Sequence, residues 1–328
     1  DGAEGKVEGQ IKLAMPVGDE FDRSLIRAEG KVKVSDGRMK QVGGSLDVQG
    51  AGVTFEFSDK AIDAKGEMLV NGVPAKLTWQ RIFDAPPDKQ PPVRLTMVLD
   101  NADRNQLGLD VNHMMQGEVP VEVTVSRGPQ GDSLVRMRAD LTNAELNVDT
   151  IAWRKPAGRS AYVQFDIVKG RTAKYELQNL QLAGDDIAIE GSASLGADNR
   201  PMEFHFPSFS FNVVTRLDVR GKLRSDNVWD IKAKGSTFDG RDFFRALFNV
   251  GAASVKPQKP RAGTDVDAEI DTVIGFSEVS LRGVKLKLSK RGDKLSGLAV
   301  TGTLDGGQPL AVELRQKPGE PRRLLADS

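Results

Sequence analysis

Apolar and polar residues alternate along most of this sequence, most regularly in the stretch 217–248. An apolar residue or glycine occupies every second position from 217 to 223, and charged residues fill the positions between. After a polar turn at 224–227, the same alternation runs from 229 to 235. A period of two places successive side chains on opposite faces of a strand. The stretch therefore predicts a hairpin with one apolar and one polar face.

A short motif, in which two alternating apolar residues are followed by a glycine, recurs along the chain. It occurs at 26–30, 46–50, 62–66, 187–191 and 298–302. The glycine falls on the apolar side each time, where it lets a strand bend or lets another group approach closely. This recurrence predicts one long sheet that is built from similar hairpins and curved in the same way throughout.

The remaining alternating runs bring the expected total to roughly 20 strands with little helix. Asp36-Gly37 and Asn71-Gly72 predict tight two-residue turns, the first of which would separate a strand ending at Val34 from one spanning 42–48. We therefore predict a mainly β fold, a long curved antiparallel sheet that forms an open groove or trough with a few short helices. A sandwich or a closed barrel would also cover the apolar face.

Two short helical regions interrupt the strands. Residues 101–117 break the alternation, and Asn101 or Asp103 is expected to cap a helical turn there. A second helix follows Asp239, which with Asp242 resembles a capping box. Its apolar face contains Phe243, Phe244, Leu247 and Phe248. This helix either caps an open end of the sheet or plugs the groove.

The expected organisation is one continuous β segment over 1–315. Long loops are predicted at 84–92, which is rich in proline, and at 251–264. The second segment has no regular spacing of apolar residues and is expected to be disordered. A frayed tail is predicted at 316–328. The strand-like first residues suggest a fragment of a longer protein.

Composition excludes several classes of function. Lys and Arg together number 46, as do Asp and Glu, so the chain lacks the positive excess that nucleic-acid binding requires. There is no cysteine, which excludes disulfides, thiolate metal sites and cysteine nucleophiles. No signal peptide is visible, and no apolar run is long enough for a membrane-spanning helix.

Two stretches, 139–158 and 229–244, carry a resemblance to a known family. The first reads ADLTNAELNVDTIAWRKPAG and the second WDIKAKGSTFDGRDFF. Together they resemble the AsmA-like proteins of Gram-negative bacteria, in particular the YhdP-type branch, and the likeness covers most of residues 90–310. The resemblance implies a periplasmic segment of a protein anchored in the inner membrane. Such proteins form bridges that carry phospholipids toward the outer membrane along an apolar β-groove.

The resemblance selects a set of groove-lining candidates that would contact phospholipid acyl chains. These are Val121, Val123, Val125, Leu217, Val219, Ile231, Ala233, Leu298 and Val300. The alternation of apolar and polar residues, taken by itself, instead favours a β-sandwich in which the same side chains form the core. The resemblance carries no catalytic residues, and neither an enzyme nor a cofactor is expected. The alternative function is an envelope assembly module that binds proteins by strand addition.

Other polar features of the sequence have simpler explanations. The run 153–156 would meet a lipid phosphate through its cations, or be a solvated loop with a packed indole. The alternating acids at 265–271 suggest calcium, but their spacing places them on one exposed strand face without a calcium loop. His113 and His205 lack a triad pattern, and the pair Asp185-Asp186 reads as a turn.

Overall fold

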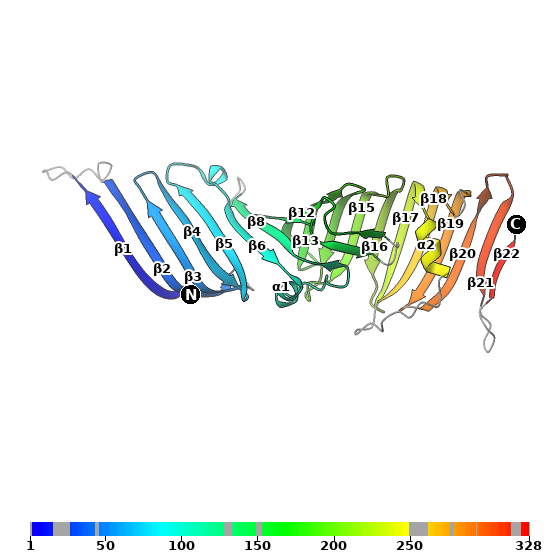
Figure 1. Cartoon of the computed structure of the whole chain (residues 1–328), viewed down its shortest axis with the longest axis horizontal. Coiled ribbons are helices and arrows are strands. Elements are labelled where there is room, and N and C mark those ends of the chain that lie inside the picture. The colour runs from blue at the N-terminus through cyan, green and yellow to red at the C-terminus, as the bar shows by residue number, and fades with distance from the viewer. Residues whose placement is uncertain are drawn as a thin grey trace. The chain divides into compact units, whose positions relative to one another are not determined.

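The computed structural model describes residues 2–15, 27–42, 46–127, 133–148, 153–248, 262–275, 279–292, 294–315 and 323–327. Strands dominate, and most of them belong to one large mixed sheet that stays open (Figure 1). Within the described ranges, the helical elements are α1 (Asn101–Gln106), α2 (Arg241–Phe248) and one 3-10 turn, η2 (Pro87–Lys89). No helix in the described part of the chain is long and apolar enough to cross a membrane. The predicted mainly β, open-sheet class is confirmed.

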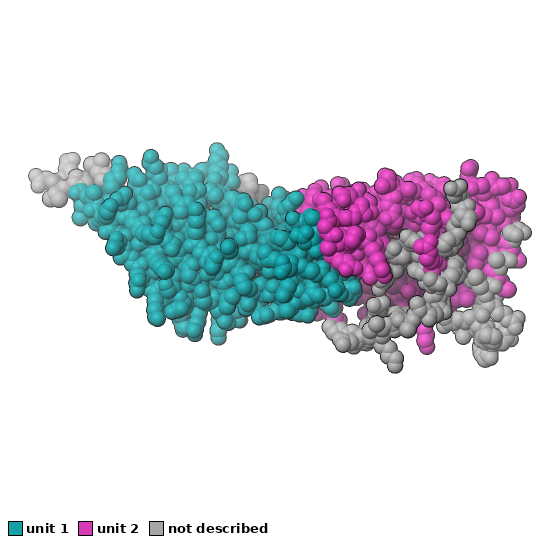
Figure 2. Space-filling model, viewed as in Figure 1, with its two compact units in different colours: residues 1–144, 166–168 teal, residues 145–165, 169–328 magenta. Residues whose placement is uncertain are grey.

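The contacts within the chain define two compact units, which Figure 2 distinguishes by colour. Unit 1 contains residues 1–144 and 166–168, and unit 2 contains residues 145–165 and 169–328.

Unit 1 is a meander of neighbouring antiparallel strands. Its strands are β1 (Glu4–Ala14), β2 (Arg27–Val42), β3 (Leu46–Phe57), β4 (Ala61–Val70), β5 (Val73–Ile82), β6 (Val93–Leu99), β8 (Val119–Arg127) and β9 (Ser133–Asp140). The short strand β7 (Met115–Gln116) also lies in unit 1 but is not part of this meander. The tight turn predicted at Asn71-Gly72 joins β4 to β5, with positive φ angles of 47° and 84°. Residues 84–92 form the predicted loop and include η2.

Most strands of unit 2 also pair with their neighbours along the chain, whereas residues 145–148 and 153–155 pair with each other in a separate small sheet. Unit 2 contains β10 (Glu145–Val148), β11 (Trp153–Lys155), β13 (Tyr175–Gly184), β14 (Ile187–Leu195), β15 (Pro201–Phe211), β16 (Arg216–Leu223), β17 (Val228–Asp239), β18 (Gly263–Ile274), β19 (Ser280–Arg291), β20 (Lys294–Leu304), β21 (Pro309–Arg315) and β22 (Arg323–Asp327). The remaining strand, β12 (Ala161–Lys169), contributes residues to both units. Strand β22 lies in the segment 316–328, where no strand was predicted, and pairs with β21.

The prediction of a turn at Asp36-Gly37 is wrong. Strand β2 runs through both residues to Val42, and Gly37 faces Ala51 of β3 where the register shifts. The φ angle of Asp36 is +54°, a value that is compatible with a β-bulge as well as with a turn. The predicted strand at 42–48 is therefore divided between the end of β2 and the start of β3.

The sheet is not purely antiparallel, because β17 and β18 are parallel neighbours. A parallel pair needs a crossover connection, and residues 240–262 provide one that contains α2 (Arg241–Phe248). Asp239 ends β17, and its carboxylate accepts hydrogen bonds from the backbone N–H of Arg241 and from its guanidinium. The side chain of Asp242 and residues 249–261 lie outside the described part of the chain.

Helix α1 (Asn101–Gln106) is capped one residue earlier than predicted. The Asp100 carboxylate accepts a hydrogen bond from the Asp103 backbone N–H at 2.8 Å, and the Asp103 carboxylate accepts one from the Asp100 N–H at 3.1 Å. This is a reciprocal capping box. Asp103 therefore occupies the third helical position rather than the cap.

Arg104 fixes the loop around α1 from inside. Its side chain is 2% exposed, and its guanidinium donates to the carbonyl oxygens of Leu99 at 2.9 Å and Gly117 at 2.8 Å. It also donates to the side-chain oxygens of Asn112 and Asn101. Burial lowers the pKa of Arg104, although the nearby Asp100 and Asp103 carboxylates oppose this shift. One cation thus joins the end of β6, helix α1 and the approach to β8.

Glycines on the apolar side permit close approach, one of the two roles predicted for them. A Cβ atom at Gly221 would lie 2.3 Å from the ring of Phe204, which covers this glycine from the neighbouring strand. At Gly235 it would lie 2.1 Å from the backbone oxygen of Arg216. Aromatic side chains that cover glycines in this way help to fix strand register.

Candidate functional site

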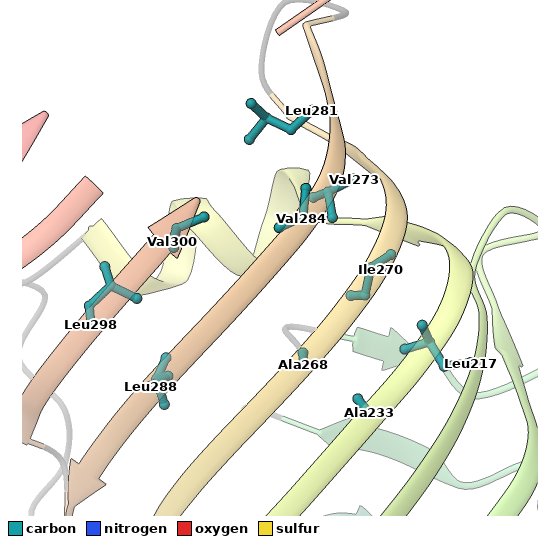
Figure 3. Close-up of a cluster of buried hydrophobic side chains, with 10 residues drawn as sticks. All are labelled: Leu217, Ala233, Ala268, Ile270, Val273, Leu281, Val284, Leu288, Leu298 and Val300. Carbon is teal, nitrogen blue, oxygen red and sulfur yellow. The ribbon is translucent and has the colours of Figure 1, made fainter. Parts of the chain in front are cut away.

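The candidate site in unit 2 is the apolar face of strands β16 to β21, hereafter the unit 2 apolar face. Two rows of side chains cross it in register. The first row is Ile231, Val266, Leu288, Leu298 and Leu314, and the second is Val219, Ala233, Ala268, Leu286, Val300 and Val312. Figure 3 shows the ten buried side chains that form the core of this face. Apolar side chains, some of them buried, therefore follow one another from strand to strand without a polar interruption in these rows.

Six of the nine groove-lining candidates lie on this face, and the structure brings five of them together. Leu217, Ala233, Leu298 and Val300 belong to one buried cluster, and Val219 packs against it. Ile231 lies in the first row, beside Val266.

The candidates differ in accessibility. Those that are nearly inaccessible are Val121 (5% exposed), Leu217 (9%), Ala233 (8%), Leu298 (4%) and Val300 (5%). Val123, Val125, Val219 and Ile231 are half-buried and retain apolar surface that a ligand can cover. The fully buried members therefore contribute to packing, and the half-buried members are the ones available for binding.

The apolar face of unit 1 is built in the same way. Val121, Val123 and Val125 alternate along β8 and face Met97, Leu95 and Val93 of β6. One row continues from Val123 through Leu95, Leu77, Gly66, Val53 and Val34 to Val7. A core of Ala51, Val53 and Ala64 underlies its middle, with Trp79 and Phe55 packed against it. Each unit thus presents a multi-strand apolar face.

A chain of aromatic rings leads across unit 2 to helix α2. Successive ring centroids of Phe204, Phe206, Phe209, Phe211, Phe238, Phe243 and Phe244 lie 5.0 to 6.4 Å apart. Phe243 and Phe244 pack against the buried cluster, so the described part of α2 contacts the unit 2 apolar face. The side chains of Leu247 and Phe248 are outside the described residues.

A shallow hollow of about 250 Å³ lies where β15 kinks beside β16. Pro207, Ser208, Phe209, Ser210, Arg216 and Leu217 line it. This is slightly smaller than the 300–1,000 Å³ typical of enclosed ligand pockets. The extended face, rather than this hollow, is therefore the stronger candidate for binding a long apolar molecule.

The opposite face of unit 2 is charged, as the alternation predicts. Lys234 contacts Glu269 at 2.9 Å, and Asp265 contacts Arg291 at 2.7 Å and Arg224 at 3.0 Å. These carboxylates balance cations on neighbouring strands. Over the described ranges, no group of three or more His, Asp or Glu side chains is arranged to hold a metal ion.

Asp265 gives this face a measurable pH dependence. The guanidinium of Arg291, then Ser289 and Arg224, lower the pKa of Asp265 to about 2 from a usual value of 3.8. Because the folded-state pKa is depressed, the stabilisation is complete above about pH 4 and is lost as pH falls toward 2. We expect Asp265→Asn to be less stable than the wild type at pH 7 and to converge with it near pH 2. Urea unfolding at several pH values measures this, and a difference independent of pH would contradict it.

Residues 153–155 of the run 153–156 form the strand β11 rather than a solvated loop. Trp153 is 3% exposed, which confirms the packed indole, and Lys155 is 2% exposed, with its Nζ donating to the Pro156 carbonyl at 3.0 Å. Arg154 is exposed. The ammonium of Lys155 therefore lies inside the protein, and Arg154 alone of this run's cations faces solvent.

The two histidines and the paired acids also have defined places. His205 lies on the polar side of β15, with its Nε2 atom 3.3 Å from the Asp218 carboxylate, and His113 is exposed. Asp185 and Asp186 form a bend and both contact Arg159, at 3.6 and 3.2 Å. None of these contacts forms a nucleophile–base–acid arrangement.

Sequence reasoning assigned no site role to several members of the two apolar faces. In unit 2 these are Val266, Ala268, Ile270, Leu286, Leu288, Leu310, Val312 and Leu314, and in unit 1 they are Leu77, Leu95 and Met97. Their signal was present in part, because most of them alternate with polar residues along their strands. What was missing was register, which decides which alternating strands share a row.

No family model, curated protein or solved structure matched this chain in comparisons of sequence and fold.

Proposed function

We propose that the chain carries phospholipids by shielding their acyl chains on its apolar sheet faces, without catalysing a reaction. In this proposal it is a periplasmic segment of an AsmA-like bridge that is anchored in the inner membrane and carries lipid toward the outer membrane. The observation that supports the proposal best is the continuity of the apolar rows from Val219 to Val312 and from Ile231 to Leu314.

The physical properties of such a face suit transport. Burial of apolar area contributes roughly 25 cal/mol per Å² wherever the acyl chain lies, so binding is insensitive to position along the rows. A chain can then move from one strand to the next without crossing a charged barrier. The charged outer face, with pairs such as Lys234–Glu269, keeps the opposite side of the same strands in water.

Adjacent residues on β17 provide a matched test. Ile231 is half-buried on the apolar face, whereas Lys232 is exposed on the opposite face. We expect Ile231→Glu to weaken binding of a fluorescent phospholipid at least tenfold, because a carboxylate against an acyl chain costs more than about 1.4 kcal/mol. We expect Lys232→Glu to bind within about twofold of the wild type.

Circular dichroism must show that both variants remain folded. A titration with labelled phospholipid then compares their affinities. Equal affinity of both variants and the wild type would contradict the proposal, as would a wild-type chain that binds no phospholipid.

A further inference from the structure

Helix α2 occupies part of the apolar face to which the proposed function assigns phospholipid. Phe243 and Phe244 pack against the buried cluster of that face, which contains Leu217 and Val300. The ring of Phe243 also contacts that of Phe238 near the end of β17, with centroids 5.7 Å apart. An acyl chain that spread over this cluster would therefore need surface that the two rings of α2 already cover.

The order of α2 depends on its packing against the face. The helix is eight residues long, whereas isolated helices shorter than about 12–15 residues are marginal in water. Phe243 and Phe244 supply apolar contacts to the cluster, and both side chains remain half-buried. A molecule that competes for the same apolar surface would therefore displace the helix from it.

The chain enters α2 through a fixed turn. Asp239 is 7% exposed, its N–H donates to the Thr215 hydroxyl at 3.1 Å, and its carboxylate accepts from the Arg241 guanidinium at 2.8 and 2.6 Å. The Gly240 N–H donates to the carbonyl oxygen of Ile274 in β18 at 2.9 Å. These bonds hold the start of the helix to the ends of β17 and β18, so motion of α2 away from the face would turn about this point.

Gly240 allows α2 to approach the sheet closely at this turn. A Cβ atom at Gly240 would lie 2.6 Å from the ring of Phe244 and 3.0 Å from a methyl group of Val273, which belongs to the buried cluster. The φ angle of Gly240 lies outside the left-handed region, so alanine does not strain the backbone there. A methyl group added at Gly240 would therefore push the ring of Phe244 out of its present position.

We propose that α2 is a displaceable cover of the unit 2 apolar face. It lies on the face when no acyl chain is bound, and an entering acyl chain takes the place of Phe243 and Phe244 while the turn at 239–241 stays fixed. Between lipids the cover keeps apolar surface out of water, where an open apolar face favours aggregation. This inference rests on the proposed function, because it concerns the regulation of the same lipid-binding face.

Competition between α2 and lipid fixes the sign of the effect on lipid affinity. When a protein binds its ligand in only one of two states, the apparent dissociation constant is the intrinsic constant divided by the fraction of molecules in that state. Loosening α2 raises the fraction of molecules with an open face and should tighten lipid binding. If the rings of α2 were instead part of the lipid-binding surface, the same change would weaken binding.

Variants of the full chain test this sign in titrations with a phosphatidylcholine that carries a fluorescent acyl chain. We expect Phe243→Ser/Phe244→Ser to bind roughly three- to tenfold more tightly than the wild type, as for a cover that is closed in about 70–90% of molecules. Gly240→Ala keeps both rings but displaces one of them, and it should bind at least about twofold more tightly.

Phe206→Ser is the matched control, because it removes the same kind of side chain from β15 rather than from α2. Phe206 lies opposite Val219 on the apolar face, so its loss should leave the affinity unchanged or lower it. Circular dichroism must show that all three variants remain folded.

Hydrogen exchange reports the position of α2 independently of affinity. The Phe244 N–H donates to the Gly240 carbonyl oxygen at 2.8 Å in the first turn of the helix. Its exchange in the wild type should be at least about fivefold faster with saturating phosphatidylcholine than without it, because α2 is too short to stay helical away from the face.

The outcomes separate this inference from the proposed function. If the wild type binds phosphatidylcholine, unchanged or weaker binding by Phe243→Ser/Phe244→Ser or by Gly240→Ala would overturn the cover. Exchange at Phe244 that is slower or unchanged with lipid would also overturn it, while leaving lipid binding intact. A wild-type chain that binds no phosphatidylcholine would overturn the proposed function and this inference with it.

Discussion

Replacing Arg104 with alanine is expected to lower the free energy of unfolding of unit 1 by about 3 kcal/mol. The substitution leaves the carbonyl oxygens of Leu99 and Gly117 without the buried donor that satisfies them. Each buried acceptor without a partner costs about 1–3 kcal/mol, and hydrogen bonds from a charged donor are at the upper end of that range. Urea unfolding followed by circular dichroism measures the loss, and hydrogen exchange in β6 and β8 assigns it to unit 1.

Arg94→Ala is the control for this experiment. Arg94 contacts Glu122 at 3.1 Å, and both side chains are substantially exposed. Such a surface pair contributes about 0–1 kcal/mol. Equal losses from the two substitutions would show that Arg104 does not organise the loop around α1.

Phe211→Ala is expected to destabilise unit 2 by about 4 kcal/mol, the cost of deleting a large buried aromatic side chain. Phe211 is 1% exposed and lies at the centre of the aromatic chain, with edge contacts to Phe209 at 5.6 Å and Phe238 at 6.2 Å. Its removal leaves a cavity beneath the rings that lead to α2. Thermal and urea unfolding measure the change.

Met202→Ala on the same strand is the control, since Met202 is 44% exposed. It should cost less than about 1 kcal/mol. A loss from Phe211→Ala as small as that of the control would mean that the aromatic chain is not part of the packed core.

The sequence predicted the strands well because the apolar residues alternate strictly with charged ones. The hairpin of β16 and β17 follows directly from that alternation, and the turn at Asn71-Gly72 follows from residues that accept positive φ. The placement of Asp265 and Glu269 on a charged face also follows from their spacing.

Other features depend on contacts that no local pattern contains. Asp36-Gly37 suits both a turn and a bulge, and only pairing with Ala51 of β3 decides between them. The parallel pairing of β17 with β18 depends on where the connection through α2 returns. The role of Arg104 was not predicted, because its acceptors are backbone carbonyls and asparagine side chains rather than acidic side chains.

The candidate site was predicted only in part for a similar reason. Alternation identified Val219, Ala233 and Val300 as residues of apolar faces, but not that they lie in one row. It also could not distinguish buried Leu298 from half-buried Ile231, because alternation assigns a residue to a face of the strand and does not say how far that face is covered. Exposure depends on the neighbouring strands and on the packing of Phe243 and Phe244.

Photocrosslinking with a phospholipid that carries a reactive group in its acyl chain tests the central proposal most directly. Mass spectrometry of the digested adducts locates the acyl chain on individual residues. We expect adducts on half-buried apolar residues such as Val123, Val219 and Ile231, and none on Lys232 or Lys234 of the opposite face. Adducts distributed equally over the two faces, or no adducts, would contradict the proposal.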